Sequence, residues 1–136
     1  MYSQRNLFIA TALLEIGSGL VTLFLPSVAI WLLFGVNTTS PELLATGRLY
    51  GAALLAIGVA CWCIRDEKAS RSLRAVLCGM LTYNVGACSV LPLVAMLEGI
   101  SGALLWPATL LHAALTVWCV SVIREIKRAS RSVETS

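Results

Sequence analysis

The sequence predicts an all-α integral membrane protein: a single domain, residues 1–136, that folds as a left-handed antiparallel four-helix bundle. The composition predicts membrane insertion, because 58% of the 136 residues are apolar, only 12% are charged, and the mean hydropathy is +0.85. Soluble domains are about 45–50% apolar and about 25% charged. The composition therefore excludes a soluble globular enzyme, a disordered chain and a nucleic-acid-binding protein. Four apolar runs and the placement of the basic residues predict the rest of the fold.

Each apolar run corresponds to one predicted helix. The runs cover residues 7–34, 43–64, 73–97 and 103–123, and a basic tail of residues 124–136 follows. A membrane-spanning helix takes about 17–25 apolar residues. At about 1.5 Å per residue the first run would extend roughly 42 Å, against about 30 Å of hydrocarbon. We therefore expect the first run to tilt, kink or emerge from the bilayer, with Pro26 as the expected kink.

The basic residues predict the orientation of the helices. Nine of the ten precede the first run, connect the second and third runs, or follow the fourth: Arg5; Arg65, Lys68, Arg71 and Arg74; and Arg124, Lys127, Arg128 and Arg131. The first and third connections carry no Lys or Arg. Because Lys and Arg accumulate in cytoplasmic loops, we expect both termini to lie in the cytoplasm.

A weak internal repeat suggests that the chain consists of two duplicated helical hairpins. The segment Leu25-Pro26-Ser27-Val28-Ala29 resembles Leu91-Pro92-Leu93-Val94-Ala95, and Pro41 and Pro107 are separated by the same interval. Two hairpins of equal topology, related by an axis along the membrane normal, would produce this pattern. Coincidence in a chain so rich in apolar residues would produce it as well.

Polar side chains inside the apolar runs are the candidate functional residues. Lipid offers them no hydrogen bonds, so each is expected to face protein or water. The candidate ligand-binding residues, at least one from each run, are Glu15, Arg48, Tyr83, Asn84 and His112. Gly47 and Gly51, which flank Arg48, have the spacing that lets two membrane helices approach closely.

Two structural interpretations compete with a ligand-binding site. In the first, Glu15 and Arg48 form a buried bridge that fixes the helix order, and Asn84 and His112 are hydrogen-bonded core residues. In the second, Arg48 extends to the outer surface, and Glu15 is protonated or extends to the inner one. In the functional interpretation these groups form a site for a ligand or a proton, as ionisable groups inside membranes often do.

The five cysteines do not predict a metal site. Cys61, Cys63, Cys78 and Cys119 lie near the cytoplasmic ends of their runs, at similar depth, where four thiols could bind zinc. However, the chain contains no CxxC pair, and Cys61 and Cys63 point about 200° apart on a helix. We expect the cysteines to act as small apolar side chains, with no metal and no cofactor.

Several short motifs resemble one group of known proteins. They are Leu14-Glu15 with Gly19, Gly47-Arg48-Leu49-Tyr50-Gly51, Tyr83-Asn84, and Leu105-Trp106-Pro107 with His112. In this combination the chain resembles the small bacterial four-span inner-membrane proteins of uncharacterised function. The resemblance covers nearly the whole chain. It implies a bacterial inner membrane and suggests that the polar residues are the common feature, but it implies no reaction.

Three classes of function are compatible with the sequence. The favoured one is binding or transport of a small ligand or a proton at the buried polar site. The second is a non-catalytic membrane accessory or assembly protein whose buried polar residues are structural. The third, a small membrane enzyme with Glu15 or His112 as acid or base, is the least favoured. The expected partners are the lipid bilayer, a small molecule, and a second copy or another membrane protein, but no nucleic acid.

Labelling of single cysteines tests the predicted orientation, in a chain whose five native cysteines are replaced. We expect a membrane-impermeant maleimide to label Asn37→Cys from outside the cell and Ser70→Cys from the cytoplasmic side, because the charge distribution assigns these connections to opposite faces. The reverse pattern, or labelling of both cysteines from one side, would contradict the predicted topology.

Overall fold

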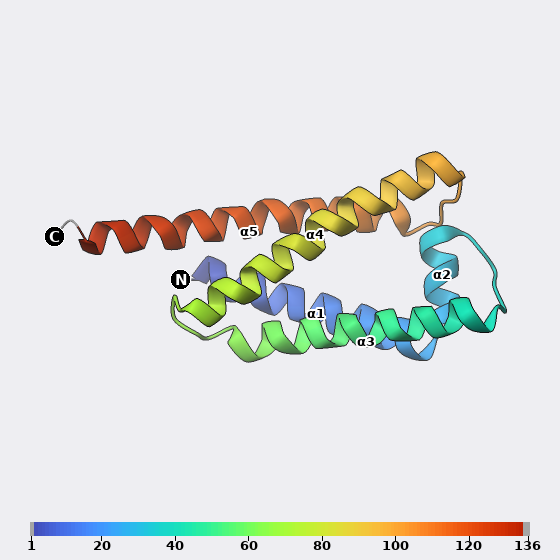
Figure 1. Cartoon of the computed structure of the whole chain (residues 1–136), viewed down its shortest axis with the longest axis horizontal. Helices are drawn as coiled ribbons and strands as arrows, with labels where there is room; N and C mark the ends of the chain where they lie inside the picture. Colours follow the sequence, from blue (N-terminus) through green and yellow to red (C-terminus); the bar gives the residue numbers. More distant parts are fainter. Residues whose placement is uncertain (1, 135–136) are drawn as a thin grey trace.

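The computed structural model describes residues 2–134, with side chains for residues 3–129, and the regular secondary structure of this part of the chain is all helix, without strands (Figure 1). Its helices are α1 (Tyr2–Phe24), α2 (Pro26–Phe34), α3 (Pro41–Ile64), α4 (Arg71–Glu98) and α5 (Leu105–Glu134). By length and composition, α1, α3, α4 and α5 are each able to span a membrane. The prediction of an all-helical chain with four long apolar helices is therefore confirmed.

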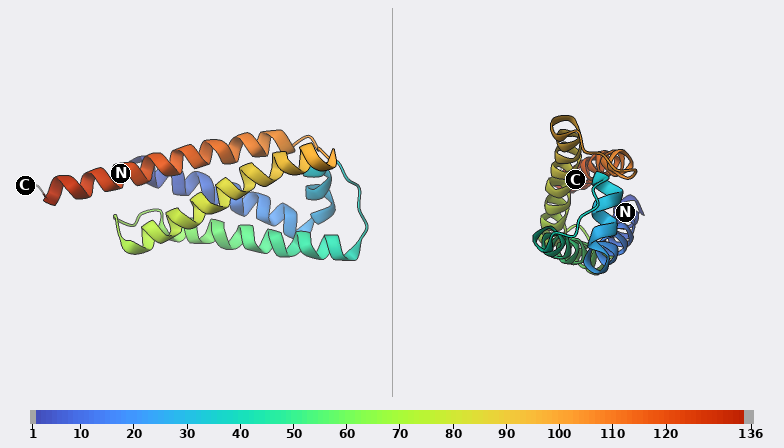
Figure 2. Two further views of the ribbon diagram at one scale, coloured as in Figure 1. Left: turned by 45° about the horizontal axis from the view of Figure 1, so that its top comes forward. Right: turned by 90° about the vertical axis from the view of Figure 1, so that its right-hand side faces the viewer.

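The long helices run back and forth along the molecule. Figures 1 and 2 show that both ends of the chain lie at the same end of the molecule as the connection between α3 and α4, and that α2 lies across the opposite end. The predicted basic tail, residues 124–136, continues α5 as far as Glu134, and its last two residues lie outside the described part of the chain.

The first apolar run, residues 7–34, breaks at Pro26, where the sequence predicted a kink, and contributes to two helices instead of one. Leu25 has a non-helical backbone, with φ −127° and ψ 56°, and Pro26 begins α2. A proline has no N–H and its fixed φ suits the first helical position, so the chain changes direction here at little cost. Pro92, its counterpart in the suggested repeat, remains inside α4. The two halves of the chain therefore differ at these matched prolines.

The contact between α1 and α3 is the closest in the molecule that involves two long helices. A Cβ atom added at Gly51 would lie 2.5 Å from the backbone nitrogen of Leu23 and 2.9 Å from the carbonyl oxygen of Gly19. One added at Gly58 would lie 2.7 Å from Cγ1 of Ile16. Gly47, Gly51 and Gly58 recur at helical spacing on one face of α3, where Gly51 and Gly58 lie against α1 and Gly47 lies against Pro26 at the start of α2.

The hydrophobic core fills the end of the molecule that carries the chain termini. It combines side chains from α1, α3, α4 and α5: Leu7, Phe8, Ala12, Cys61, Leu73, Leu77, Met80, Leu115, Cys119, Val122 and Ile126. At this end, Arg5 donates a hydrogen bond of 2.7 Å from Nε to Oδ1 of Asp66, which holds the pKa of Asp66 below its usual value. Both side chains are exposed, so the ion pair contributes little to stability.

The opposite end is closed by α2 and the connection between α4 and α5. The backbone N–H of Gly102 donates to the carbonyl of Leu33 at 2.9 Å, and that of Leu104 donates to the carbonyl of Leu32 at 2.8 Å. A side chain at Gly102 would collide with the backbone of Leu32. The two closed ends leave the space between them for the pocket described below.

Gly51→Ala tests the close packing of α1 on α3. The added methyl group would overlap backbone atoms that cannot rotate away, and we expect a loss of about 1–3 kcal/mol in stability, as in other overpacked interiors. Gly86→Ala is the matched control, since a Cβ atom at Gly86 meets nothing within 4 Å. Thermal unfolding in detergent measures both variants. Equal stability of the two variants would contradict the close contact.

Candidate functional site

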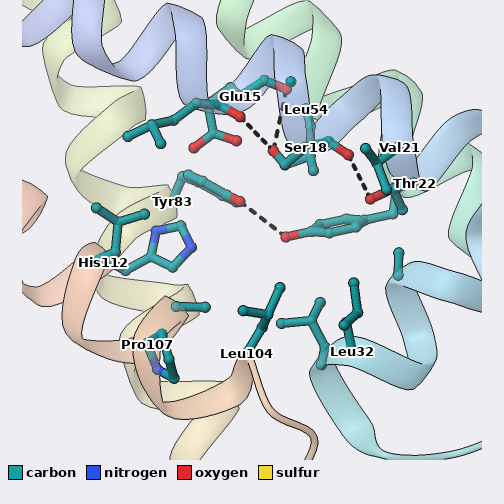
Figure 3. Close-up of a pocket in the computed structure, with 17 residues that line it drawn as sticks. Glu15, Ser18, Val21, Thr22, Leu32, Leu54, Tyr83, Leu104, Pro107 and His112 are labelled. Atoms are coloured by element: carbon teal, nitrogen blue, oxygen red, sulfur yellow. Dashed lines mark hydrogen bonds between the residues drawn. The ribbon is translucent and has the colours of Figure 1, made fainter.

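A pocket of about 440 Å³ lies between the two closed ends (Figure 3). Its 17 lining residues come from α1, α2, α3, α4 and the start of α5. The polar ones are Glu15, Ser18, Thr22, Tyr50, Tyr83 and His112. The apolar ones are Leu14, Gly17, Val21, Ala29, Leu32, Leu33, Leu54, Leu104, Pro107, Ala108 and Leu111. The pocket is therefore an apolar space with a small polar region.

Glu15 is the one charged side chain among the lining residues, and it is only 3% exposed. Its carboxyl group lies beside the Tyr83 side chain (Figure 3). The hydroxyls of Tyr83 and Tyr50 lie 3.0 Å apart and form a hydrogen bond in which either can donate. This bond connects α4 and α3 next to Glu15 of α1.

His112 is oriented by Asn84. The Asn84 side chain is fully buried and donates from Nδ2 to the carbonyl of Met80 at 2.8 Å. Its Oδ1 is 2.8 Å from Nδ1 of His112 and therefore accepts, so Nδ1 carries the proton. Nε2 of the neutral ring is then a hydrogen-bond acceptor. The ring packs edge-on against Tyr83, with 5.3 Å between the ring centroids.

Arg48 does not pair with Glu15, contrary to the first structural interpretation. Its side chain is exposed, and the described part of the chain contains no ion pair between these two residues. The cause is the direction of the side chain. Gly51 faces α1 and Gly47 faces Pro26 of α2, and Arg48 points about 100° away from Gly47 on the helix. Whether the exposed Arg48 extends toward a membrane surface, as in the second interpretation, stays a prediction.

The sequence-predicted candidates are thus brought together only in part. Glu15, Tyr83 and His112 line the pocket, Asn84 lies behind His112 and holds it, and Arg48 lies outside. Tyr50 was not predicted as a site residue. Its position on the helix was the available signal: it lies two residues after Arg48 and therefore points about 160° away from it.

The hydroxyls of Ser18 and Thr22 extend the polar strip along α1. Ser18 donates to the carbonyl of Leu14 at 2.8 Å, and Thr22 donates to the carbonyl of Ser18 at 2.7 Å. Both hydroxyl protons are therefore used within the helix, and what remains toward the pocket is the capacity to accept hydrogen bonds.

The rim of the pocket is apolar. Leu14 and Val21 of α1, Leu104 just before α5 and Leu111 of α5 line the pocket and are themselves 39–45% exposed. The pocket therefore reaches the molecular surface between α1 and α5. Its rim offers contacts to apolar molecules and no charge.

Two further observations bear on the site: the described residues contain no candidate metal centre, and comparisons with known proteins found no match. Within the described residues, no group of three or more His, Cys, Asp or Glu side chains could hold a metal ion. Cys61 and Cys119, from the thiol cluster considered above, belong to the hydrophobic core. Comparisons with protein-family models, curated proteins and solved structures found no match to this chain.

Proposed function

We propose that the chain is an integral membrane protein, an antiparallel bundle in which α1, α3, α4 and α5 cross a bacterial inner membrane and both termini are cytoplasmic. Support comes from the length and apolarity of these helices. Nine of the ten basic residues belong to the end that carries the termini and the connection between α3 and α4, the pattern of a cytoplasmic face (Figure 1). In this orientation the pocket lies in the outer half of the bundle.

We further propose that the protein binds a small, largely apolar molecule with one polar group in this pocket. The observation that carries the proposal is the convergence of Glu15, Tyr83, Tyr50 and His112 on one region of an otherwise apolar space. The volume of about 440 Å³ falls within the range of about 300–1,000 Å³ typical of small-molecule sites. A molecule dissolved in the bilayer would reach the site between α1 and α5, across the apolar rim.

A purely structural role accounts for only some of the buried polar residues. Asn84 has both ends of its amide hydrogen-bonded, which is what a packing residue requires. Glu15, by contrast, is buried without a basic partner and borders unfilled space. Because such a carboxylate is costly in a membrane interior, its retention favours a ligand-binding role over an accessory role.

A bulky residue at Gly17 tests the proposal. Gly17 lines the pocket, and a Cβ atom there meets nothing within 4 Å, so Gly17→Trp fills the pocket without disturbing the helix contacts. The probe is para-benzoylbenzyl alcohol, a neutral apolar photolabel, irradiated with the protein in lipid vesicles. We expect Gly17→Trp to reduce labelling of the peptide that contains Tyr83 by about tenfold, which corresponds to about 1.4 kcal/mol of binding.

Gly79→Trp is the matched control. A Cβ atom at Gly79 also meets nothing within 4 Å, but Gly79 does not line the pocket. Its labelling should equal that of the unmodified chain. Labelling that is absent from the pocket peptides of the unmodified chain, or that falls equally in both variants, would overturn the proposed ligand site.

A further inference from the structure

The pocket offers mainly hydrogen-bond acceptors, because most of its donors are used internally. The hydroxyls of Tyr50 and Tyr83 bond to each other, which uses one of their two protons. The Nδ1 proton of His112 is directed to Asn84. The hydroxyl protons of Ser18 and Thr22 bond to carbonyls of their own helix. The groups left toward the pocket are therefore mainly acceptors: the carboxyl group of Glu15, hydroxyl oxygens and, in the neutral ring, the Nε2 lone pair of His112.

The charged groups of the pocket also favour a cation, because they include one acidic residue and no Lys or Arg. Glu15 is its one charged lining residue, no Lys or Arg lines it, and Arg48 on the neighbouring helix points away. The bond from His112 to Asn84 places a proton on Nδ1 and directs it away from the pocket. An unbalanced carboxylate that is 3% exposed attracts a positive charge, because the surrounding protein and lipid screen it poorly.

The aromatic rings beside the carboxylate suit a cation as well. Tyr50 and Tyr83 both line the pocket, next to Glu15. The face of a tyrosine ring attracts an ammonium or similar group within about 6 Å by its quadrupole. The remaining walls are aliphatic and suit the apolar part of the same molecule.

We propose that the ligand is a monovalent organic cation with an apolar body, whose positive group binds between Glu15 and the tyrosine pair. This inference rests on the proposed ligand site and specifies its ligand class. One charge is indicated because one carboxylate is present. An anion would meet the carboxylate and acceptors only, and a neutral molecule would leave the carboxylate unbalanced.

Three photolabels that share the benzophenone body test the inference in lipid vesicles. They are the alcohol used above, the fixed cation para-benzoylbenzyl-trimethylammonium, and the anion para-benzoylbenzoate. We expect the cation to reach half-saturation of the Tyr83 peptide at a concentration about tenfold lower than the alcohol, equivalent to about 1.4 kcal/mol. The anion should not label this peptide. Gly17→Trp should abolish labelling by the cation, and Gly79→Trp should leave it unchanged.

Variants at Glu15 separate charge recognition from pocket formation. Glu15→Gln, a neutral residue of the same shape, should remove the preference for the cation while the alcohol still labels the pocket. Glu15→Asp should retain the preference in part. If the alcohol labels the pocket and the cation shows no advantage, or if the advantage persists in Glu15→Gln, the cation inference is overturned while the proposed ligand site stands. If no probe labels the pocket of the unmodified chain, the proposed site itself fails.

Discussion

The close contact between α1 and α3 determines the directions of the other side chains on these two helices. Gly51 and Gly58 must face α1, because any Cβ atom at either position would overlap α1. With this face fixed, the rotation of both helices about their axes is fixed as well. Glu15 and Tyr50 then lie on the same side of the pair, and Arg48 lies on the other side.

The pocket exists because the rest of the bundle closes at its two ends. The core of Phe8, Leu77 and Val122 joins all the long helices near the termini, together with Cys61 of α3. At the other end, the backbone N–H groups of Gly102 and Leu104 donate hydrogen bonds to carbonyls in the last turns of α2. Between these ends, Tyr83 is the one lining residue that α4 contributes. A space of this kind, with polar groups on one side and an apolar rim, suits a ligand that arrives from lipid.

Much of the fold could be predicted from the sequence because the signals are local. Apolar runs predict long helices, and Pro26 interrupts the first of them because it cannot donate a hydrogen bond. The extension of α5 beyond residue 123 was not predicted, since the apolar run ends there while the helix does not. An apolar run shows where a helix contacts lipid or core, but it does not show where the helix ends. The helix can continue through charged residues such as Arg124, because arginine is a good helix former.

The site was harder to predict because it depends on helix rotation. Depth and charge both favoured a partnership of Glu15 with Arg48, yet the glycine face turns Arg48 away. Tyr50 was overlooked because a tyrosine in an apolar run is commonly a packing residue. Asn84 and His112 were grouped correctly as polar neighbours, but their hydrogen bond, with Asn84 behind the ring, follows from how α4 packs on α5. Sequence spacing alone specifies neither the rotation nor the packing of two distant helices.

Chemical modification of Glu15 tests the central claim most directly, namely that its carboxyl group borders an apolar pocket open to lipid. Dicyclohexylcarbodiimide is apolar, partitions into membranes and forms a stable N-acylurea with carboxyl groups that it reaches there. The chain has seven Asp and Glu residues, and mass spectrometry of the protein in vesicles identifies which are modified. We expect Glu15 to be the principal site and Gly17→Trp to protect it. If Glu15 remains unmodified while exposed carboxyls such as Asp66 react, the account is contradicted.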